Sequence, residues 1–345
     1  MYTFINGSED HIILYINNSL ILVTRRLYII EEVIPMNFET CFQISSAILM
    51  EGALGERLKR EYSVEFDDKV AMAGLVYNTH SREAMESIFK EYVTIAEKYK
   101  LPFIATTPTR RANLEHVMQS EFDEKIIEDN VRFLQKIKTY ASTDMFVGGL
   151  MGCKGDAYKA TEILSIQEAH KLHSWQANLF KNSGVDFLFA GIMPALSEAI
   201  GMAKAMENTG LAYIISFMIR NNGRLIDGTT IHDAILSIDN ETLRKPICYM
   251  ANCVHPIVLK KALSCSCNET KLVKERFRGI QANTSQLSPE ELDNSDDLKT
   301  SDSISLACNM MELNDYLTPK IFGGCCGTDN THIEEIAKRL KMVDL

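Results

Sequence analysis

Two adjacent cysteines near the carboxyl end of the chain, Cys325 and Cys326, are the residues best suited to metal chemistry. They follow an apolar run that ends in Gly323 and Gly324, and glycine lets the backbone turn tightly where a strand ends. On a sharp turn both thiolates can reach one cation, and soft thiolate ligands suit zinc. The pattern therefore predicts a zinc site at the end of a strand.

The third ligand of such a site must come from elsewhere in the chain, and Cys253 is the best candidate. It closes the apolar run that begins at Tyr249, so it is also expected at a strand end. Cys153 is left out of the site, because a catalytic zinc keeps one position open. The competing interpretation is that these are ordinary core cysteines, since free cysteine is often buried without a chemical role.

Three thiolates around one zinc ion favour a specific reaction. Their negative charge makes the ion a poor activator of water but a good holder of a fourth thiolate, that of a substrate. Zinc binding lets a thiol, whose pKa is about 8.5 when free, lose its proton near neutral pH. An activated methyl group held in line could then be displaced onto this sulfur, and proximity would supply much of the rate.

Eight short apolar runs, separated mostly by helical patterns, indicate the elements that would position these cysteines. The runs lie at 46–50, 102–107, 145–149, 186–190, 212–218, 246–252, 277–282 and 320–324. Apolar residues between 82 and 99 recur at a spacing of three and four, which predicts an amphipathic helix there.

Helix boundaries are also marked in the sequence. The pairs Ser165–Glu168 and Thr331–Glu334 match capping boxes at helix starts. Gly184 and Gly210 stand where helices should end.

This alternation predicts an α/β protein whose residues 46–345 form one (β/α)8 TIM barrel, in which chemistry gathers at the carboxyl ends of the strands. Cys253 then lies at the end of the sixth strand and Cys325 and Cys326 at the end of the eighth, near enough to share an ion. A doubly wound open sheet is the competing architecture. It would not by itself bring the sixth and eighth strand ends together.

Residues 1–45 are interpreted as an N-terminal extension. The apolar stretch from 11 to 30 is interrupted by asparagine and arginine, so it is too short for a membrane span, and it lacks the flanks of a signal peptide. Residues 12–16 and 20–24 could form a hairpin. The alternative is an extension without catalytic duty that arises from an upstream start codon.

Composition excludes several classes of protein. With 345 residues, of which 46% are hydrophobic, the chain can bury a large core. A net charge of −10 argues against nucleic acid as a partner. Nine scattered cysteines do not form the dense framework of a secreted disulfide scaffold, so a cytoplasmic, reducing environment is expected.

The sequence GGCCGT at 323–328, together with Asn252 and Cys253, resembles the homocysteine S-methyltransferase family. These are zinc-dependent thiol methyltransferases, among them betaine–homocysteine methyltransferase-like enzymes. The resemblance runs from about Ser46 to the end of the chain. It implies a zinc ion held by Cys253, Cys325 and Cys326, and methyl transfer from an activated donor to homocysteine, giving methionine.

The same resemblance implies four substrate-binding residues. Glu51 stands where the family usually has an aspartate that meets the ammonium of the amino-acid substrate. Thr106 and Thr107 match a hydroxyl-bearing segment near the substrate, and Asn252 precedes the first cysteine. Residues 284–303, rich in serine and acid, are expected to form a solvated loop near the barrel mouth.

One departure from the family concerns the acceptor. Gly191 replaces the glutamate that binds the amine of homocysteine, and Glu198 is a displaced acid that could compensate. Arg110 and Arg111 follow the second strand and could bind a carboxylate bidentately. His255 is interpreted as polar surface.

Alternative functions remain open at this point. They are methyl transfer to or from another thiol or a corrinoid protein, and a non-catalytic barrel that binds zinc or a small ligand. A small-molecule thiol and a methyl donor are the expected partners, without nucleic acid or membrane. The donor, whether S-methylmethionine, a betaine, a methylated folate or a methylated corrinoid, is not determined by the sequence, and neither is the oligomeric state.

Overall fold

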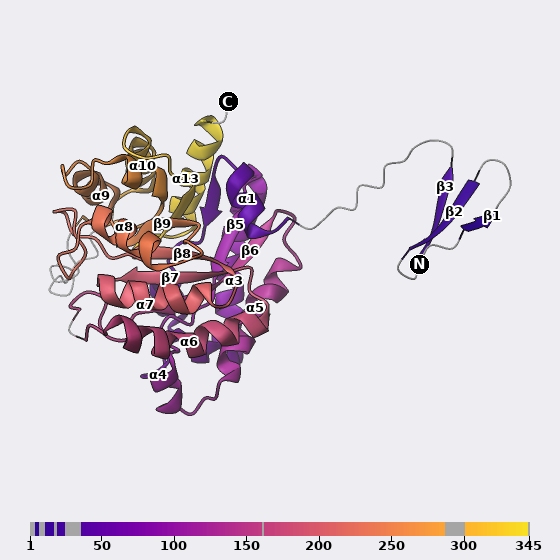
Figure 1. Cartoon of the computed structure of the whole chain (residues 1–345), viewed down its shortest axis with the longest axis horizontal. Helices are drawn as coiled ribbons and strands as arrows, with labels where there is room; N and C mark the ends of the chain where they lie inside the picture. The colour runs from indigo at the N-terminus through magenta and orange to yellow at the C-terminus, as the bar shows by residue number, and fades with distance from the viewer. Residues whose placement is uncertain are drawn as a thin grey trace. The chain divides into compact units, whose positions relative to one another are not determined.

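Eight parallel strands form a closed barrel in which helices alternate with strands (Figure 1). In the computed structural model the ring order is β10-β11-β4-β5-β6-β7-β8-β9. The strands are β4 Ile48–Met50, β5 Phe103–Thr106, β6 Met145–Gly152, β7 Phe187–Met193, β8 Ala212–Phe217, β9 Cys248–Val254, β10 Phe277–Ala282 and β11 Ile321–Gly324. Each of the eight predicted runs overlaps one of these strands, and the predicted (β/α)8 barrel is confirmed.

The structure describes residues 36–160, 162–286 and 301–343, together with three N-terminal strands. These strands, β1 Phe4–Asn6, β2 His11–Ile16 and β3 Ser19–Thr24, form an antiparallel sheet in a separate unit that comprises residues 1–36. β2 pairs with β3, as the predicted hairpin requires. The rest of residues 1–35, and residues 287–300 of the predicted loop, lie outside the described residues.

The helices fall between the strands as the apolar periodicity indicates, and the predicted helix at 82–99 is part of α3. No helix of the described residues is long and apolar enough to cross a membrane. The helices are α1 Phe38–Ile44, α2 Gly55–Tyr62, η1 Met72–Tyr77, α3 Thr79–Tyr99, α4 Leu114–Met118, α5 Lys125–Lys138, α6 Ile166–Ser183, α7 Leu196–Glu207, α8 Ile231–Glu241, α9 Pro256–Leu263, α10 Lys271–Arg276, α12 Ser303–Met311, η2 Glu312–Asp315 and α13 Asn330–Val343.

The two predicted capping boxes have different outcomes. At the start of α6 both hydrogen bonds of the box between Ser165 and Glu168 form. At the start of α13 the prediction is wrong, because Asp329 accepts from the backbone nitrogens of Thr331 (2.9 Å) and His332 (3.2 Å). Aspartate is as good a cap as threonine, and here it stands two residues earlier.

The compact unit that contains the barrel begins at Asn37, so the expected boundary at residue 46 lies too far along the chain. Helix α1 belongs to the barrel unit, since Phe38 is buried and its ring stacks on that of Phe187, with centroids 4.1 Å apart. The same apolar cluster includes Ile48 and Ile321, the first residues of β4 and β11. Helix α1 therefore closes the amino-terminal end of the barrel.

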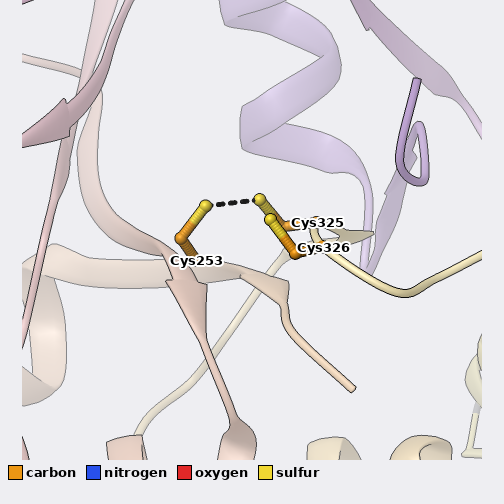
Figure 2. A group of neighbouring side chains, drawn as sticks. All are labelled: Cys253, Cys325 and Cys326. Carbon is orange, nitrogen blue, oxygen red and sulfur yellow. Dashed lines mark hydrogen bonds between the residues drawn. The ribbon is translucent and has the colours of Figure 1, made fainter. Parts of the chain in front are cut away.

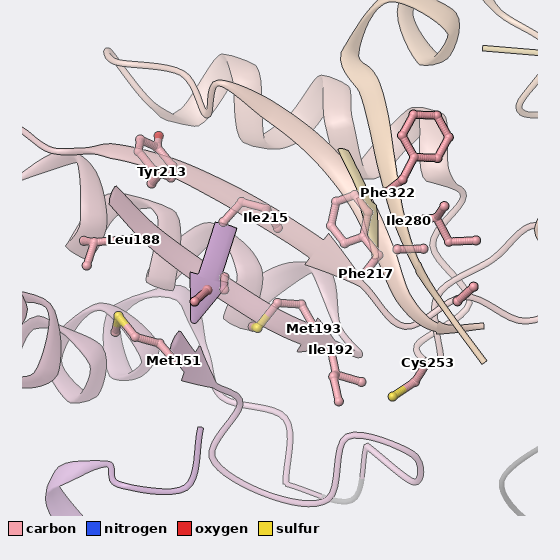
Figure 3. Packing of buried hydrophobic residues seen from close by; sticks show 14 of the residues in the cluster. Met151, Leu188, Ile192, Met193, Tyr213, Ile215, Phe217, Cys253, Ile280 and Phe322 are labelled. Atoms are coloured by element: carbon pink, nitrogen blue, oxygen red, sulfur yellow. The ribbon is translucent and has the colours of Figure 1, made fainter. Parts of the chain in front are cut away.

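Alternation along the strands divides the core into two layers. On β7, Phe187 and Phe189 face the interior cluster, whereas Leu188 and Ala190 belong to the layer between strands and helices. Successive side chains of a strand point to opposite faces, and both faces of a barrel strand are covered. The outer layer reaches the carboxyl ends of the strands, where Figure 3 shows Cys253 among buried apolar side chains.

Candidate metal and substrate site

Cys253, Cys325 and Cys326 come together at the carboxyl ends of β9 and β11 (Figure 2). The Sγ atoms of Cys253 and Cys325 are 2.6 Å apart although the residues are 72 positions apart in sequence. All three Sγ atoms lie within 4.8 Å of one another. All nine cysteines of the chain are free, so these three thiols are available to a metal.

A β-bulge points Cys253 at the other two cysteines. In the pairing of β9 with β10, Asn252 lies opposite Gln281 and Val254 opposite Ala282, so Cys253 has no partner. Its φ of +58° lies in the left-handed region, which costs a non-glycine residue about 1 kcal/mol or more. Bulges of this kind re-aim a side chain next to functional sites.

The turn that carries Cys325 and Cys326 is held by its backbone. Cys325 N donates to Ala282 O (2.8 Å), and Cys326 N donates to the Oδ1 of Asn283 at the end of β10 (3.1 Å). Gly327 has a φ of +81°, and a Cβ there would lie 2.0 Å from the Oγ1 of Thr284. Glycine is therefore required at this position for the two thiols to point together.

The three thiols cannot all ionise without a cation, because like charges this close repel. Hydrogen bonds from Cys325 and Cys326 to the sulfur of Cys253 lower the pKa of Cys253. The same contacts with Cys253 raise the pKa values of Cys325 and Cys326. A bound cation would remove this conflict, so the donor set, three sulfurs with an open side, fits a borderline-soft ion.

A cavity of about 310 Å³ opens beside the sulfur atoms. All seven residues predicted for the site line it: Glu51, Thr106, Thr107, Asn252, Cys253, Cys325 and Cys326. Their strands are far apart in sequence, and closing the barrel places the strand ends around one space. The size and the mixture of apolar and polar walls suit a small molecule.

Glu51 is a buried carboxyl at the end of β4, with 5% of its surface exposed. It accepts a hydrogen bond from the Oγ1 of Thr106 (2.6 Å) and contacts from the backbone nitrogen of Thr106 (3.2 Å). Burial raises the pKa of Glu51 to about 7, and the hydrogen bonds from Thr106 limit this rise. A cation that enters the cavity would therefore find a carboxyl group ready to ionise.

Thr107 is fully buried and joins β5 to β6. The hydroxyl of Thr109 donates to Leu150 O (2.8 Å), so the Thr107 hydroxyl must be the donor in its 2.7 Å contact with Thr109. Leu150 N in turn donates to Thr107 Oγ1 (3.0 Å). The hydroxyl hydrogen of Thr107 is therefore already donated to Thr109 within the wall. Towards a substrate the Thr107 oxygen can act only as a hydrogen-bond acceptor.

Asn252 ties three strands together beside the bulge. Its Oδ1 accepts from Ile192 N (2.9 Å) on β7 and from the Oγ of Ser216 (2.6 Å) on β8. Ile192 also has a positive φ, so this hydrogen bond connects the left-handed residue of β7 with the residue that precedes Cys253, the left-handed residue of β9. Asn252 therefore has a positioning role in addition to its predicted place in the cavity wall.

The space beside Gly191 is taken up by a leucine side chain rather than by an acid. A Cβ on Gly191 would lie 2.8 Å from the Cδ1 of Leu150, so the leucine side chain fills the adjoining space. Glu198 does not compensate. It is 1% exposed and accepts from Lys154 N (2.7 Å) and from the Nε2 of His173 (3.0 Å), away from the cavity wall.

The other residues considered in the sequence analysis differ in whether they line the cavity. Arg110 lines the cavity, whereas Arg111 is exposed and does not. His255 is not polar surface as expected: it is 2% exposed and caps α9 by accepting from Ile257 N. Cys153 is buried outside the cavity wall, and burial raises the pKa of its thiol to about 12.

Tyr158 is a site residue that the sequence analysis did not assign. Its hydroxyl donates to the sulfur of Cys253 (3.5 Å) and its ring lines the cavity. The residue lies in the segment after β6, six positions beyond the end of that strand at Gly152, where no strand pattern marks it. The glycine-rich composition of that segment was the only local sign of an unusual chain path.

The structure is thus a TIM barrel with three cysteines at its strand ends that could hold a metal ion. The model of the family described as "Homocysteine S-methyltransferase" matches residues 48–340, and the chain belongs to that family. It is accordingly an enzyme of the S-methyltransferase class. No curated protein sequence matches the chain.

Solved structures agree with the fold. The metallated form of the homocysteine methyltransferase MmuM from Escherichia coli superposes with a TM-score of 0.67 at 18% identity, covering 86% of this chain and 97% of that one. The oxidized form of the same protein gives 0.68 at 17% identity, with the same coverage. The apo form gives 0.61 at 16% identity.

Proposed function

We propose that this enzyme transfers a methyl group from an activated donor to the thiol of homocysteine, giving methionine, with a zinc ion held by Cys253, Cys325 and Cys326. The observation that carries the proposal is the three-cysteine cluster at the wall of a cavity of substrate size. When bound there, zinc would lower the pKa of a substrate thiol so that its sulfur is nucleophilic at neutral pH.

The residues of the chain have separate tasks in this proposal. Glu51, held by Thr106, would ionise against the ammonium of the amino-acid substrate. Asn252 would keep the bulge at Cys253 in place and present its amide nitrogen to the cavity, while Thr107 would fix the wall and offer an acceptor. Tyr158 would donate its hydroxyl hydrogen to the sulfur of Cys253 and so moderate the charge of that thiolate.

The cavity also has to exclude water from the transfer. Leu150, Ile192 and Phe89 contribute apolar surface around the polar groups. A dry wall strengthens every charge interaction in the site and leaves the substrate sulfur as the nucleophile. The free state of all nine cysteines supports a reducing, cytoplasmic setting for such a thiol centre.

The test is a matrix of thiols and methyl donors with the zinc-loaded enzyme. Homocysteine is compared with cysteine, 2-mercaptoethanol and glutathione, each with S-methylmethionine, a betaine, a methylated folate and a methylated corrinoid protein. We expect methionine to form with at least one donor and homocysteine to give the highest kcat/KM. Faster methylation of another thiol would reject homocysteine as acceptor, and no methylation of any thiol would reject the proposal.

A further inference from the structure

Arg110 is a half-buried arginine at the wall of the cavity, four positions after Thr106. Its guanidinium forms no hydrogen bond or ion pair with any residue in the described part of the chain. Arg57 shows the usual arrangement, since its buried guanidinium binds both Glu61 and Glu91 at 2.8 Å. A guanidinium with five donors that is partly removed from water and has no partner is suited to bind an anion.

The end of β6 is shaped around this arginine. A Cβ on Gly152 would lie 2.6 Å from the Cγ of Arg110 and 2.7 Å from its backbone oxygen. The absence of a side chain at Gly152 therefore allows the Arg110 stem to cross the strand end. By contrast, the neighbouring Arg111 is exposed and lies outside the cavity wall.

Charges in the cavity complement those of an α-amino acid. Glu51, from the end of β4, supplies a carboxyl group, and Arg110, from the segment after β5, supplies a guanidinium. These strands are neighbours in the barrel. The three thiols at the ends of β9 and β11 line the same cavity, so the site offers contacts for an ammonium, a carboxylate and a sulfur.

We propose that Arg110 binds the carboxylate of an amino-acid substrate in this cavity through paired, charge-assisted hydrogen bonds. The inference rests on the proposed function for the identity of the thiol chemistry. A carboxylate of this kind is present both in homocysteine and in donors such as S-methylmethionine or a betaine. Arginine matches a carboxylate in geometry, whereas lysine supplies only a point charge.

The kinetic test compares substrates with and without a carboxylate. In Arg110→Gln we expect kcat/KM for homocysteine to fall about 10- to 100-fold, chiefly through KM, because a hydrogen bond to a charged group contributes about 1.5–3 kcal/mol. With 3-aminopropane-1-thiol, which lacks the carboxylate, the variant should equal the wild type. Arg110→Lys should recover part of the loss, and Arg111→Gln is the matched control that should change nothing.

A second arm identifies which substrate supplies the carboxylate. S-methylmethionine is compared with (3-aminopropyl)dimethylsulfonium, which keeps the ammonium but lacks the carboxylate, at saturating homocysteine. A rise in KM confined to homocysteine assigns the contact to the acceptor, and one confined to S-methylmethionine assigns it to the donor. Equal losses with carboxylate-bearing and carboxylate-free partners in both arms would overturn the inference.

Binding measurements test the carboxylate site independently of the proposed methyl transfer. Calorimetry with the zinc-loaded enzyme should show homocysteine or S-methylmethionine binding at least about 10-fold more tightly than its carboxylate-free counterpart, and Arg110→Gln should abolish the difference. This selectivity without any turnover would reject the proposed reaction and keep the carboxylate site. Equal binding of both pairs by the wild type would overturn the carboxylate site, whatever the turnover. Circular dichroism melting curves establish that the variants compared are folded.

Discussion

The two ends of the barrel are built on different principles. At the amino-terminal end α1 covers an apolar cluster in which Phe38 stacks on Phe187 and Ile48 and Ile321 are fully buried. At the carboxyl-terminal end Glu51 and Cys253 are buried, Cys325 and Cys326 are half-buried, and the backbone is bulged. The amino-terminal end therefore stabilises the fold, whereas the carboxyl-terminal end holds reactive groups in an arrangement that lowers stability.

Backbone conformation makes the same distinction. Ile192 and Cys253, at the carboxyl ends of β7 and β9, both have positive φ values, and conformations of this kind cost about 1–3 kcal/mol each. The hydrogen bond from Ile192 N to Asn252 Oδ1 connects Ile192 with the residue that precedes Cys253. Strained residues persist only where surrounding contacts hold them, and the apolar layers beneath provide this support.

The largest expected effect is at the carboxyl-terminal end. Cys325→Ala should lose bound zinc and reduce activity by more than about 100-fold, because changes to groups that merely orient metal ligands already cost 10- to 100-fold. Metal analysis and turnover assays measure both. Cys308→Ala is the matched control, since Cys308 is exposed in α12 and should retain zinc and activity. Full zinc occupancy in Cys325→Ala would end the metal assignment.

A change at the amino-terminal end should affect stability alone. Phe38→Ala removes a ring packed on Phe187 and should lower the free energy of unfolding by about 3–5 kcal/mol. Urea denaturation measures this loss, with Tyr140→Ala, at an exposed ring, expected to stay within about 0.5 kcal/mol of the wild type. Zinc content of the folded Phe38→Ala enzyme should be unchanged. Loss of zinc under conditions where the barrel is intact would show that the two ends are coupled.

The cost of presenting Glu51 should appear as a pH dependence of stability. Burial raises the pKa of Glu51 from 4.5 to about 7, so the folded state binds the proton more tightly than the unfolded state. This contribution is complete below about pH 4.5 and is lost as the pH rises through 7, and it amounts to up to about 3 kcal/mol.

Glu51→Gln isolates that contribution. The variant should lose less stability than the wild type between pH 5 and pH 8, as measured by urea denaturation at both values, while its KM for homocysteine rises. Glu83→Gln is the control, because Glu83 is exposed on α3 and lies outside the cavity wall. Parallel stability curves for Glu51→Gln and the wild type would show that Glu51 carries no such penalty.

The smallest expected effect belongs to the N-terminal unit. A chain that starts at Met36 keeps α1 and should retain the melting temperature and zinc content of the full chain, since the barrel unit begins at Asn37. A chain that starts at Ser46 lacks α1 and should unfold at a lower temperature. If the chain from Met36 aggregates or loses zinc, residues 1–35 contribute to the barrel and the proposed division of the chain is wrong.

The sequence by itself determined the strands and the position of the cysteines along them. Apolar runs of strand length report burial directly, and Gly323 and Gly324 mark the turn before the two adjacent thiols. These signals are local, so they can be recognised without knowing which distant residues contact the strands and the cysteines in the fold. Because these signals are local, they also predicted Thr331 as the cap of α13, where Asp329 is the cap. They likewise assigned α1 to the extension.

Only the tertiary structure decided how the side chains are directed at the site. The bulge at Cys253 depends on pairing with β10, and its support by Asn252 reaches Ile192, 60 positions away. The fold places Arg110 at the cavity wall, whereas Arg111, its neighbour in sequence, is exposed outside that wall. Such choices depend on contacts between distant strands, whose geometry no local pattern of residues encodes.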